Sequence, residues 1–310
     1  MNLDISVTLP TYNRAAFLEK CLEGLCAQTL SPVRYEICVV ANACTDATPD
    51  IVAQVAARHP RHRLFMVEES VPGLSRARNC GLKHTTAPLV ANVDDDGTVY
   101  PDWLERFLAR FAEFGDDLAI VSGEVEPVWA IPKPDWLTPR MQCFLSAGTG
   151  LGNEARFLGV EESSAEGNGC CRRDMLAAVG NLPVELGRVG NNLLSGENVF
   201  EKRIHQLGGR VFFDPAIILR HYIHADRLTP LWFRKRFFWQ GVSGMAVRNY
   251  QQKNGIPVDS EIMLNLPLEA EDWAFVGKDT PDGLEKSLHY FQSLGFVLAL
   301  TGLLPIDGAQ

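Results

Sequence analysis

The chain has 310 residues, 46% of them hydrophobic and 22% charged, which is ordinary for a globular protein of one or two domains. Its formal net charge of −9 argues against a general nucleic-acid binder, which needs a basic surface, so we expect no nucleic acid among its partners. No apolar run approaches the roughly 20 residues of a membrane-spanning helix, and residues 1–4 lack a basic leader. The eight cysteines show no paired zinc spacing, which predicts buried thiols in a reducing cytoplasm.

Two hydrophobic periodicities alternate along the first hundred residues. They predict strands at 5–9, 37–40, 64–67 and 89–93, and helices at 17–26, 51–56 and 74–82. Apolar strands joined by helices form a parallel sheet that is covered on both faces, so we predict an α/β fold with a doubly wound, mostly parallel sheet. Ligands of such sheets bind beyond the carboxyl ends of the strands, here just after Leu9, Val40 and Val93.

The middle of the chain is less regular. Proline and tryptophan gather at 127–139, and glycine is frequent at 148–169. Further on, the pattern predicts helices at 172–179 and 193–207 and a strand at 210–213. From about Arg227 the composition becomes aromatic and basic, so we divide the chain into an α/β domain, 1–225, and a helical C-terminal extension, 226–310.

Three adjacent carboxylates, Asp94, Asp95 and Asp96, directly follow the fourth predicted strand. Because clustered carboxylates repel one another, a cation is needed to stabilise them. Mg²⁺ or Mn²⁺ held by one or two carboxylates, with substrate phosphates completing the shell, fits this pattern. The alternative is a solvated acidic turn, since Asp and Gly are good turn formers. The position after an apolar strand favours the metal site.

Polar segments also follow the first two predicted strands, at 11–14 and 42–46. Both precede predicted helices, so Asn13 and Asp46 could be ordinary helix caps. Helix N-termini and loops in these positions could equally hold a nucleotide.

Four segments together resemble the ordered motifs of family 2 glycosyltransferases: 9–14, 42–48, 73–81 and 94–96. The resemblance continues through 166–169, 194–198, 214–215, His221 and Arg227, and it ends at 239–243. It therefore covers about residues 3–244 and implies the GT-A fold of nucleotide-diphospho-sugar transferases.

The resemblance also implies a site. Its nucleotide-sugar-binding residues are Pro10, Tyr12, Arg14, Asn42, Asp46, Arg78, Asp94 and Asp95. The metal, Mn²⁺ or Mg²⁺, would be held by Asp96 with Asp94 and His221, and it would neutralise the departing diphosphate. Alternatively, His221 and His224 are core histidines whose ring nitrogens are hydrogen-bonded within the protein. The acceptor-side residues are Gly167, Asn168 and Arg227.

Glu197 lies in the segment where the family places its catalytic carboxylates. The usual pair is Glu-Asp, with the second acid as general base, but this chain has Asn198, and an amide cannot accept the acceptor's proton. We predict that Glu197 is the base; the alternative is an impaired enzyme. Ala41 stands where many relatives have an Asp that is thought to read uracil, which leaves UDP-, GDP- and dTDP-sugars open as donors.

The segment 232–239 mixes bulky aromatic residues with cations. One interpretation is an amphipathic helix that packs on the catalytic domain while its cations face solvent. Another is a patch for a lipid-linked acceptor or for peripheral contact with the inner face of the membrane. A third places its cations near the diphosphate.

The resemblance implies an inverting glycosyltransferase that moves a sugar from a nucleotide-diphosphate donor to the hydroxyl of a glycan or lipid-linked acceptor, in polysaccharide or glycoconjugate biosynthesis. Because Asn198 replaces an acid, one alternative is a catalytically impaired sugar-nucleotide-binding or scaffold protein of the same fold. A sugar-phosphate nucleotidyltransferase is the other alternative, but it would carry a glycine-rich loop where this chain has 10–13. No glycine fingerprint of a dinucleotide dehydrogenase follows the first strand.

Overall fold

The computed structural model describes residues 3–189, 192–194, 199–256, 258 and 278–304. The chain forms two compact units, each assembled from several segments. The first unit comprises Met1–Val128, Gly148–Leu182 and Phe200–Tyr222, and the second comprises Trp129–Ala147, Pro183–Val199 and Ile223–Gln310. The sequence-based boundary between residues 225 and 226 stays a prediction.

The first half of the chain builds the parallel part of one sheet, as the periodicity predicts. Its strands lie in the order β3-β2-β1-β4, and all three pairings are parallel. The bounds are β1 Ile5–Thr11, β2 Tyr35–Asn42, β3 Arg63–Glu69 and β4 Leu89–Val93. The helices between them are α1 Ala15–Cys26, α2 Thr48–Arg58 and α3 Leu74–His84, with the short 3₁₀ helix η1 Pro32–Arg34 before β2.

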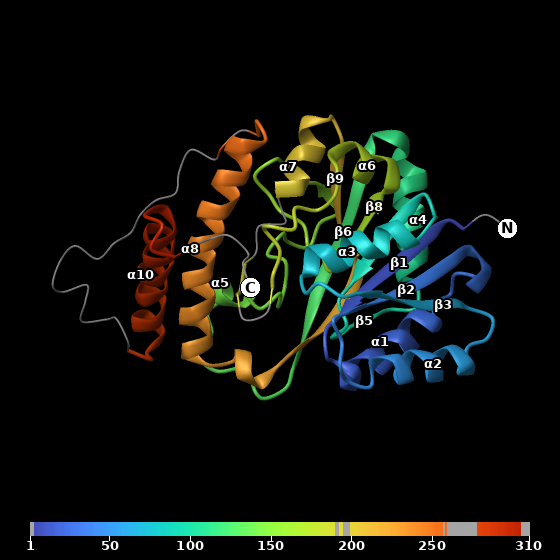
Figure 1. Ribbon diagram of the computed structural model, residues 1–310, viewed down its shortest axis with the longest axis horizontal. Coiled ribbons are helices and arrows are strands. Elements are labelled where there is room, and N and C mark those ends of the chain that lie inside the picture. The colour runs from blue at the N-terminus through green and yellow to red at the C-terminus, as the bar shows by residue number, and fades with distance from the viewer. Residues whose placement is uncertain (1–2, 190–191, 195–198, 257, 259–277, 305–310) are drawn as a thin grey trace. The chain divides into compact units, whose positions relative to one another are not determined.

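Helices cover both faces of this part of the sheet (Figure 1). Leu18 of α1 and Val52 of α2 pack in one core cluster with β1 and β2, whereas Ala77 of α3 packs against Val40 and Cys38 on the other face. Every residue of β1 and β2 is buried as a result. The α/β, doubly wound fold class is therefore confirmed.

Beyond β4 the sheet becomes antiparallel, in the order β4-β8-β6-β9-β5, with β7 paired to β9. The bounds are β5 Gly97–Val99, β6 Leu118–Trp129, β7 Arg156–Phe157, β8 Asn168–Arg172 and β9 Arg210–Ile223. The helical elements of this region are α4 Trp103–Phe114, η2 Gly115–Asp117, α6 Arg173–Val179 and α7 Val199–Gln206. The strand predicted at 210–213 is thus only the beginning of the 14-residue β9. The helix predicted at 172–179 is confirmed. Of the helix predicted at 193–207, the described residues 192–194 are not helical, and the described part is α7 Val199–Gln206.

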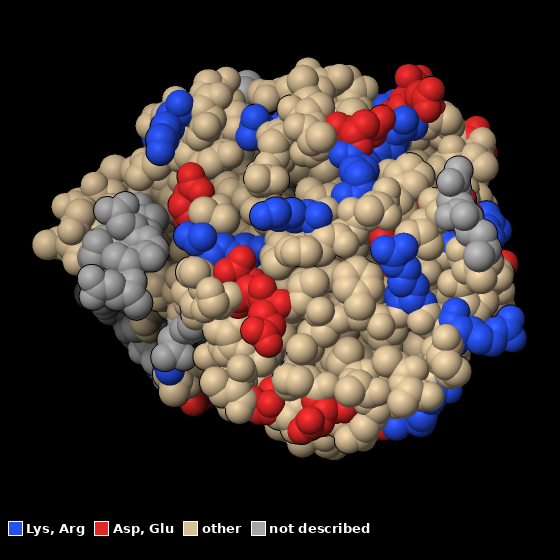
Figure 2. Space-filling model, turned by 45° about the vertical axis from the view of Figure 1, so that its right-hand side comes forward, with Lys and Arg blue, Asp and Glu red and all other residues tan. Residues whose placement is uncertain are grey.

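Charged side chains of both signs are interspersed on the face of the molecule shown in Figure 2. Many of the described arginines bind a carboxylate, for example Arg58 with Glu23 and Arg172 with Asp116, both at 2.7 Å. Such exposed pairs contribute little stability each, about 0–1 kcal/mol.

The second unit is helical and contains α5 Pro139–Cys143, η3 Ala225–Arg227, α8 Pro230–Lys253 and α10 Pro281–Leu300. Both long helices begin in the same way, with a threonine N-cap followed by proline. Thr229 accepts a hydrogen bond from the backbone of Trp232, and Thr280 from that of Gly283, each at 3.2 Å. Within the described part of the chain, no helix combines the length and the apolar character that crossing a bilayer requires.

The aromatic and basic segment 232–239 lies in α8. Phe233 and Phe237 are buried in one cluster with Leu284 of α10, so these aromatic rings pack inside the unit. Arg236 is also buried, and its guanidinium donates to Gln240 Oε1 at 2.9 Å. Burial, with a further contribution from a neighbouring arginine, lowers the pKa of Arg236 to about 10. The packed rings agree with the first interpretation, but the buried Arg236 corrects its expectation that the cations face solvent. Contact with a membrane stays a prediction.

Candidate functional site

The carboxylates that follow β4 meet the polar end of β1, as the parallel sheet predicts. The side chains of Asp95 and Asp96 are only 6% and 3% exposed, whereas that of Asp94 is 41% exposed. Thr11 Oγ1 donates to Asp95 Oδ2 at 2.8 Å. Arg14 Nη1 donates to Asp95 Oδ1 at 3.0 Å and to Asp96 Oδ2 at 2.6 Å. One guanidinium group therefore bridges two buried carboxylates.

Burial and charge together set the protonation of this cluster. Burial raises the pKa of Asp95 to about 6; Arg14 opposes that shift and the adjacent Asp96 adds to it. Burial acts against the charge of Arg14, but the carboxylates of Asp95 and Asp96 raise its pKa overall. At neutral pH Asp95 and Arg14 are therefore both mainly ionised.

His221, which comes more than a hundred residues later in the sequence, lies beside the same carboxylates. It lies on β9 opposite Gly97 of β5, which follows the carboxylates directly. Its Nε2 is 3.4 Å from Asp96 Oδ1, and the neighbouring Tyr222 donates its backbone N–H to the Asp96 carbonyl at 3.0 Å. His221 is therefore buried beside Asp96 rather than in an apolar core.

A second arginine holds the exposed carboxylate. Arg78 of α3 is buried; its Nη1 donates to Glu166 Oε2 at 2.6 Å, and its Nη2 to Asp94 Oδ1 at 3.3 Å. In this set, four carboxylates lie within ion-pair distance of two guanidinium groups. Glu166 and Thr11 were not among the predicted site residues, although both lie inside recognised motifs.

Gly167 lies directly against Asp94. A Cβ atom at this position would stand 2.5 Å from Asp94 Oδ2, closer than real contacts allow. Because the carboxylate is the movable partner, a side chain here would push Asp94 out of position. The predicted importance of Gly167 thus has a steric reason, and its acceptor-side role stays a prediction.

Gly167→Ala is expected to lower kcat/KM for the predicted sugar donor about 10–100-fold, because small displacements of site groups have effects of this size. The backbone φ of Gly167 is not positive, so alanine fits the backbone itself. Gly159→Ala is the matched control, since its Cβ would lie 3.6 Å from Glu162 Oε2, an ordinary contact. Steady-state kinetics and thermal unfolding of both variants test this, and equal kcat/KM for the two would contradict it.

Asn42 and Asp46, at the end of β2, have internal partners. Asn42 Nδ2 donates to the carbonyls of Glu69 and Val71, and its Oδ1 accepts from the N–H of Gly73 at 2.8 Å. These bonds fix the loop that leads into α3. They give Asn42 a structural role in this conformation, and its contact with a nucleotide stays a prediction.

Asp46 joins the first residues of two helices. Its Oδ2 accepts from the N–H of Ala15 at 2.9 Å, and its Oδ1 from Thr48 Oγ1 at 2.6 Å. Burial opposes the shift, but the hydrogen bonds from Thr48 and Ala15 lower the pKa of Asp46. The N-cap residue of α2 is Ala47, not Asp46, so Asp46 is not an ordinary helix cap; it links the first residues of α1 and α2. Its role in nucleotide binding stays a prediction.

The end of β1 presents one exposed aromatic ring. Pro10 is buried within β1, whereas Tyr12 is 52% exposed. Between Tyr12 and Arg14, Asn13 adopts a positive φ of 52°, and its Oδ1 accepts from the N–H of Thr45 at 2.7 Å. The loop between Thr11 and Arg14 is thus held by side-chain contacts on both sides.

Three predicted residues remain. The side chain of Asn168 is wholly buried: its Oδ1 accepts from Trp103 Nε1 at 2.7 Å, and its Nδ2 donates to two strand carbonyls. It braces the sheet behind Gly167, so in this conformation the side chain itself does not face an acceptor. Arg227 ends η3 in the second unit, and its acceptor-side role stays a prediction. Glu197 lies outside the described residues.

Comparisons with known proteins show what the chain is similar to. The model of the family described as "Glycosyl transferase family 2" matches residues 6–128. The chain is 28% identical over 224 residues to glycosyltransferase AglE of Haloferax volcanii, across 70% of this chain and 66% of that relative, slightly less than two thirds of its length. It is 30% identical over 243 residues to the succinoglycan biosynthesis protein ExoM of Rhizobium meliloti, across 77% of this chain and 73% of ExoM.

A solved structure shows the same fold. The mannosyltransferase PcManGT of Pyrobaculum calidifontis, in complex with GDP-Man and Mn²⁺, superposes with a TM-score of 0.59 at 19% identity, over 99% of this chain and 78% of that one. The fold is therefore of the GT-A type.

Proposed function

The chain belongs to family 2 of the glycosyltransferases, and from this premise we propose that it transfers a sugar from a nucleotide-diphosphate donor to an acceptor hydroxyl with inversion at the sugar carbon. The observation that carries the proposal is the cluster of Asp94, Asp95 and Asp96 bridged by Arg14, with His221 beside it. It lies at the carboxyl end of β4, where α/β sheets bind their ligands.

The donor set fits a hard divalent cation. Asp94 and Asp96 offer carboxylate oxygens, His221 offers an imidazole nitrogen, and the set carries more negative than positive charge. PcManGT was solved with Mn²⁺ and a sugar nucleotide, which supports Mn²⁺ or Mg²⁺ here. Bound at these residues, such an ion would neutralise the charge that develops on the departing diphosphate.

The chain's own residues supply the remaining functions. Arg14 and Arg78 are held next to the carboxylates by ion pairs, so they are placed to bind phosphate oxygens when a donor exchanges with those pairs. The exposed ring of Tyr12 is suited to stack on the nucleotide base, and the exposed carboxylate of Asp94 to accept from a ribose hydroxyl. Asp95, buried between Thr11 and Arg14, would position this loop rather than touch the donor.

The acceptor belongs to the same proposal. ExoM is named for succinoglycan biosynthesis, which supports a glycan or lipid-linked acceptor in polysaccharide or glycoconjugate assembly. Transfer by direct displacement needs a carboxylate that removes the proton of the acceptor hydroxyl, and we assign this role to Glu197 from its motif.

A thermal-shift screen of UDP-, GDP- and dTDP-sugars, with and without Mn²⁺, tests the proposal. One donor is expected to raise the melting temperature by a few degrees only when Mn²⁺ is present, since a ligand of the folded state stabilises it by mass action. The same donor should be hydrolysed slowly. Binding without hydrolysis or transfer would favour the impaired, scaffold-type alternative. Full turnover in excess EDTA would overturn the proposed metal dependence.

A further inference from the structure

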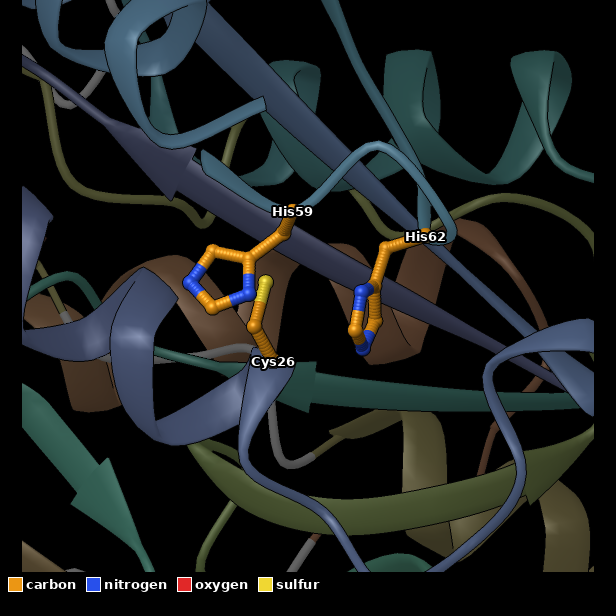
Figure 3. Close-up of side chains that lie close together, drawn as sticks. All are labelled: Cys26, His59 and His62. Carbon is orange, nitrogen blue, oxygen red and sulfur yellow. The ribbon is translucent and has the colours of Figure 1, made fainter. Parts of the chain in front are cut away.

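A second group of metal-ligating side chains lies in the first unit, away from the carboxylates. Cys26 is the last residue of α1, His59 caps the C-terminus of α2, and His62 lies just before β3. One ligand atom from each residue lies within 4.8 Å of the other two. Figure 3 shows the three side chains converging on the space between the end of α1 and the turn that joins α2 to β3.

This group lies at the opposite edge of the sheet from the candidate active site. Asp94–Asp96 follow the carboxyl end of β4, whereas His62 precedes the amino end of β3. The strands β3, β2, β1 and β4 all run parallel. Nothing in the proposed sugar transfer uses Cys26, His59 or His62. The two sites can therefore be tested separately.

Hydrogen bonding prepares His59 to be a ligand. Its Nε2 lies 2.8 Å from Glu23 Oε2, an arrangement in which the ring N–H points at the carboxylate. That leaves Nδ1 with a free lone pair on the neutral ring, as in the carboxylate–histidine pairs that orient metal ligands. Glu23 also binds Arg58 at 2.7 Å, so the carboxylate is itself held in place.

His62 and Cys26 complete the group. His62 Nδ1 is shielded from solvent and has no hydrogen-bond partner of good geometry among the described residues. The His62 ring is packed edge-on against His59 at 5.4 Å and Tyr35 at 5.8 Å between centroids. Burial, helped by Glu23, raises the pKa of the Cys26 thiol to about 12, so without a metal it is a neutral thiol beside two imidazoles.

We propose that Cys26, His59 and His62 form a site for a zinc-class transition-metal cation, with water as the fourth ligand. One sulfur and two imidazole nitrogens are a ligand set that Zn²⁺ prefers and that Mg²⁺ and Mn²⁺ do not. Bonds of about 2.3 Å to sulfur and about 2.0–2.1 Å to nitrogen require tetrahedral ligand atoms to lie about 3.3–3.6 Å apart. Ligand atoms at the present limit of 4.8 Å would therefore have to approach one another by about 1.2–1.5 Å, within reach of side-chain rotation.

Binding releases the thiol proton to solvent, and the thiolate, two imidazoles and water then surround the cation. The bound ion joins the end of α1, the end of α2 and the start of β3. Because the fold brings the three ligands together, the ion would bind the folded chain more tightly than the unfolded one and so stabilise the parallel part of the sheet.

Titration of the metal-free full chain with Co²⁺ tests the site. We expect a thiolate-to-cobalt charge-transfer absorption that saturates at one equivalent and is reversed by Zn²⁺, with a rise of a few degrees in melting temperature. Cys26→Ser should remove the absorption, and His62→Gln should weaken Co²⁺ binding at least tenfold. The matched controls Cys143→Ser and His84→Gln, at residues outside the group, should keep it.

Two further measurements separate this site from the carboxylates. Asp96→Asn should leave the cobalt absorption unchanged, and Cys26→Ser should keep its Mn²⁺-dependent donor binding. Should Cys26→Ser fail to fold, His59→Gln, whose side chain is partly exposed, takes its place. A wild-type chain with no charge-transfer absorption, or one whose absorption survives loss of Cys26, overturns the proposal.

Discussion

Replacing Asp96 with Asn is expected to reduce turnover by about 10³-fold while the fold is kept. Asn has the same size, but it removes the charge that is bound by Arg14 at 2.6 Å and faced by His221 at 3.4 Å. A divalent ion contributes several kcal/mol of stabilisation to developing charge, and each 1.36 kcal/mol is tenfold in rate. Loss of this carboxylate should therefore weaken both the affinity for Mn²⁺ and the departure of the diphosphate.

Initial rates over a range of Mn²⁺ concentrations, together with Mn²⁺ binding measured by electron paramagnetic resonance, check this expectation. Asp102→Asn serves as the control, because Asp102 is 42% exposed and pairs with Arg106 on the surface of α4. Its rate and Mn²⁺ affinity should match those of the unaltered chain. A normal rate for Asp96→Asn at low Mn²⁺ would show that the carboxylate does not hold the ion.

The parallel part of the sheet was predictable because its signal is local. The apolar runs of β1 and β2 are buried on both faces, and a continuous apolar run of this length predicts such a strand. The antiparallel part is different. β8, with the sequence NGCCR, looks like a loop in isolation, and it becomes a strand through pairing with β4 and β6, far away in the sequence.

In the candidate site, too, some residues could be predicted from local sequence and others could not. Asp94, Asp95 and Asp96 stand out as neighbours in the sequence, and Arg14 follows from the polar end of β1. The partnership of Arg78 with Glu166, 88 residues apart, depends on how α3 meets the loop before β8, and no local pattern predicts it. Asn168 is a motif residue whose structural contacts could not be predicted either: its side chain is wholly buried and accepts from Trp103.

The group of Cys26, His59 and His62 could not be recognised from the sequence, for a related reason. Zinc sites are recognised by two closely spaced pairs of ligands, and here only the two histidines are close in sequence. Cys26 joins them because α1 and α2 run antiparallel to the strands and end at the same edge of the sheet.

The second large effect on turnover is expected from replacing the proposed general base, Glu197. Displacement at the sugar carbon needs a carboxylate near the acceptor hydroxyl, and Glu197 is the acid in its motif, because Asn198 replaces the usual second acid. Glu197 lies outside the described residues, but Leu194 and Val199 on either side are buried in the core of the second unit. Glu197→Gln keeps the shape and removes the basicity, so turnover should fall by about 10²–10⁴-fold.

Donor affinity should barely change in Glu197→Gln, since the proposed donor contacts are made by the metal and the strand ends. An effect on kcat alone is the mark of an interaction made in the transition state. Asn198→Asp is the companion variant; it should be tolerated, and its rate should rise if the second position still reaches the acceptor. Single-turnover kinetics on the true acceptor, with donor binding measured in parallel, distinguish these effects. If Glu197→Gln transfers at the normal rate, the proton is removed by another group, and the assignment of this motif is wrong.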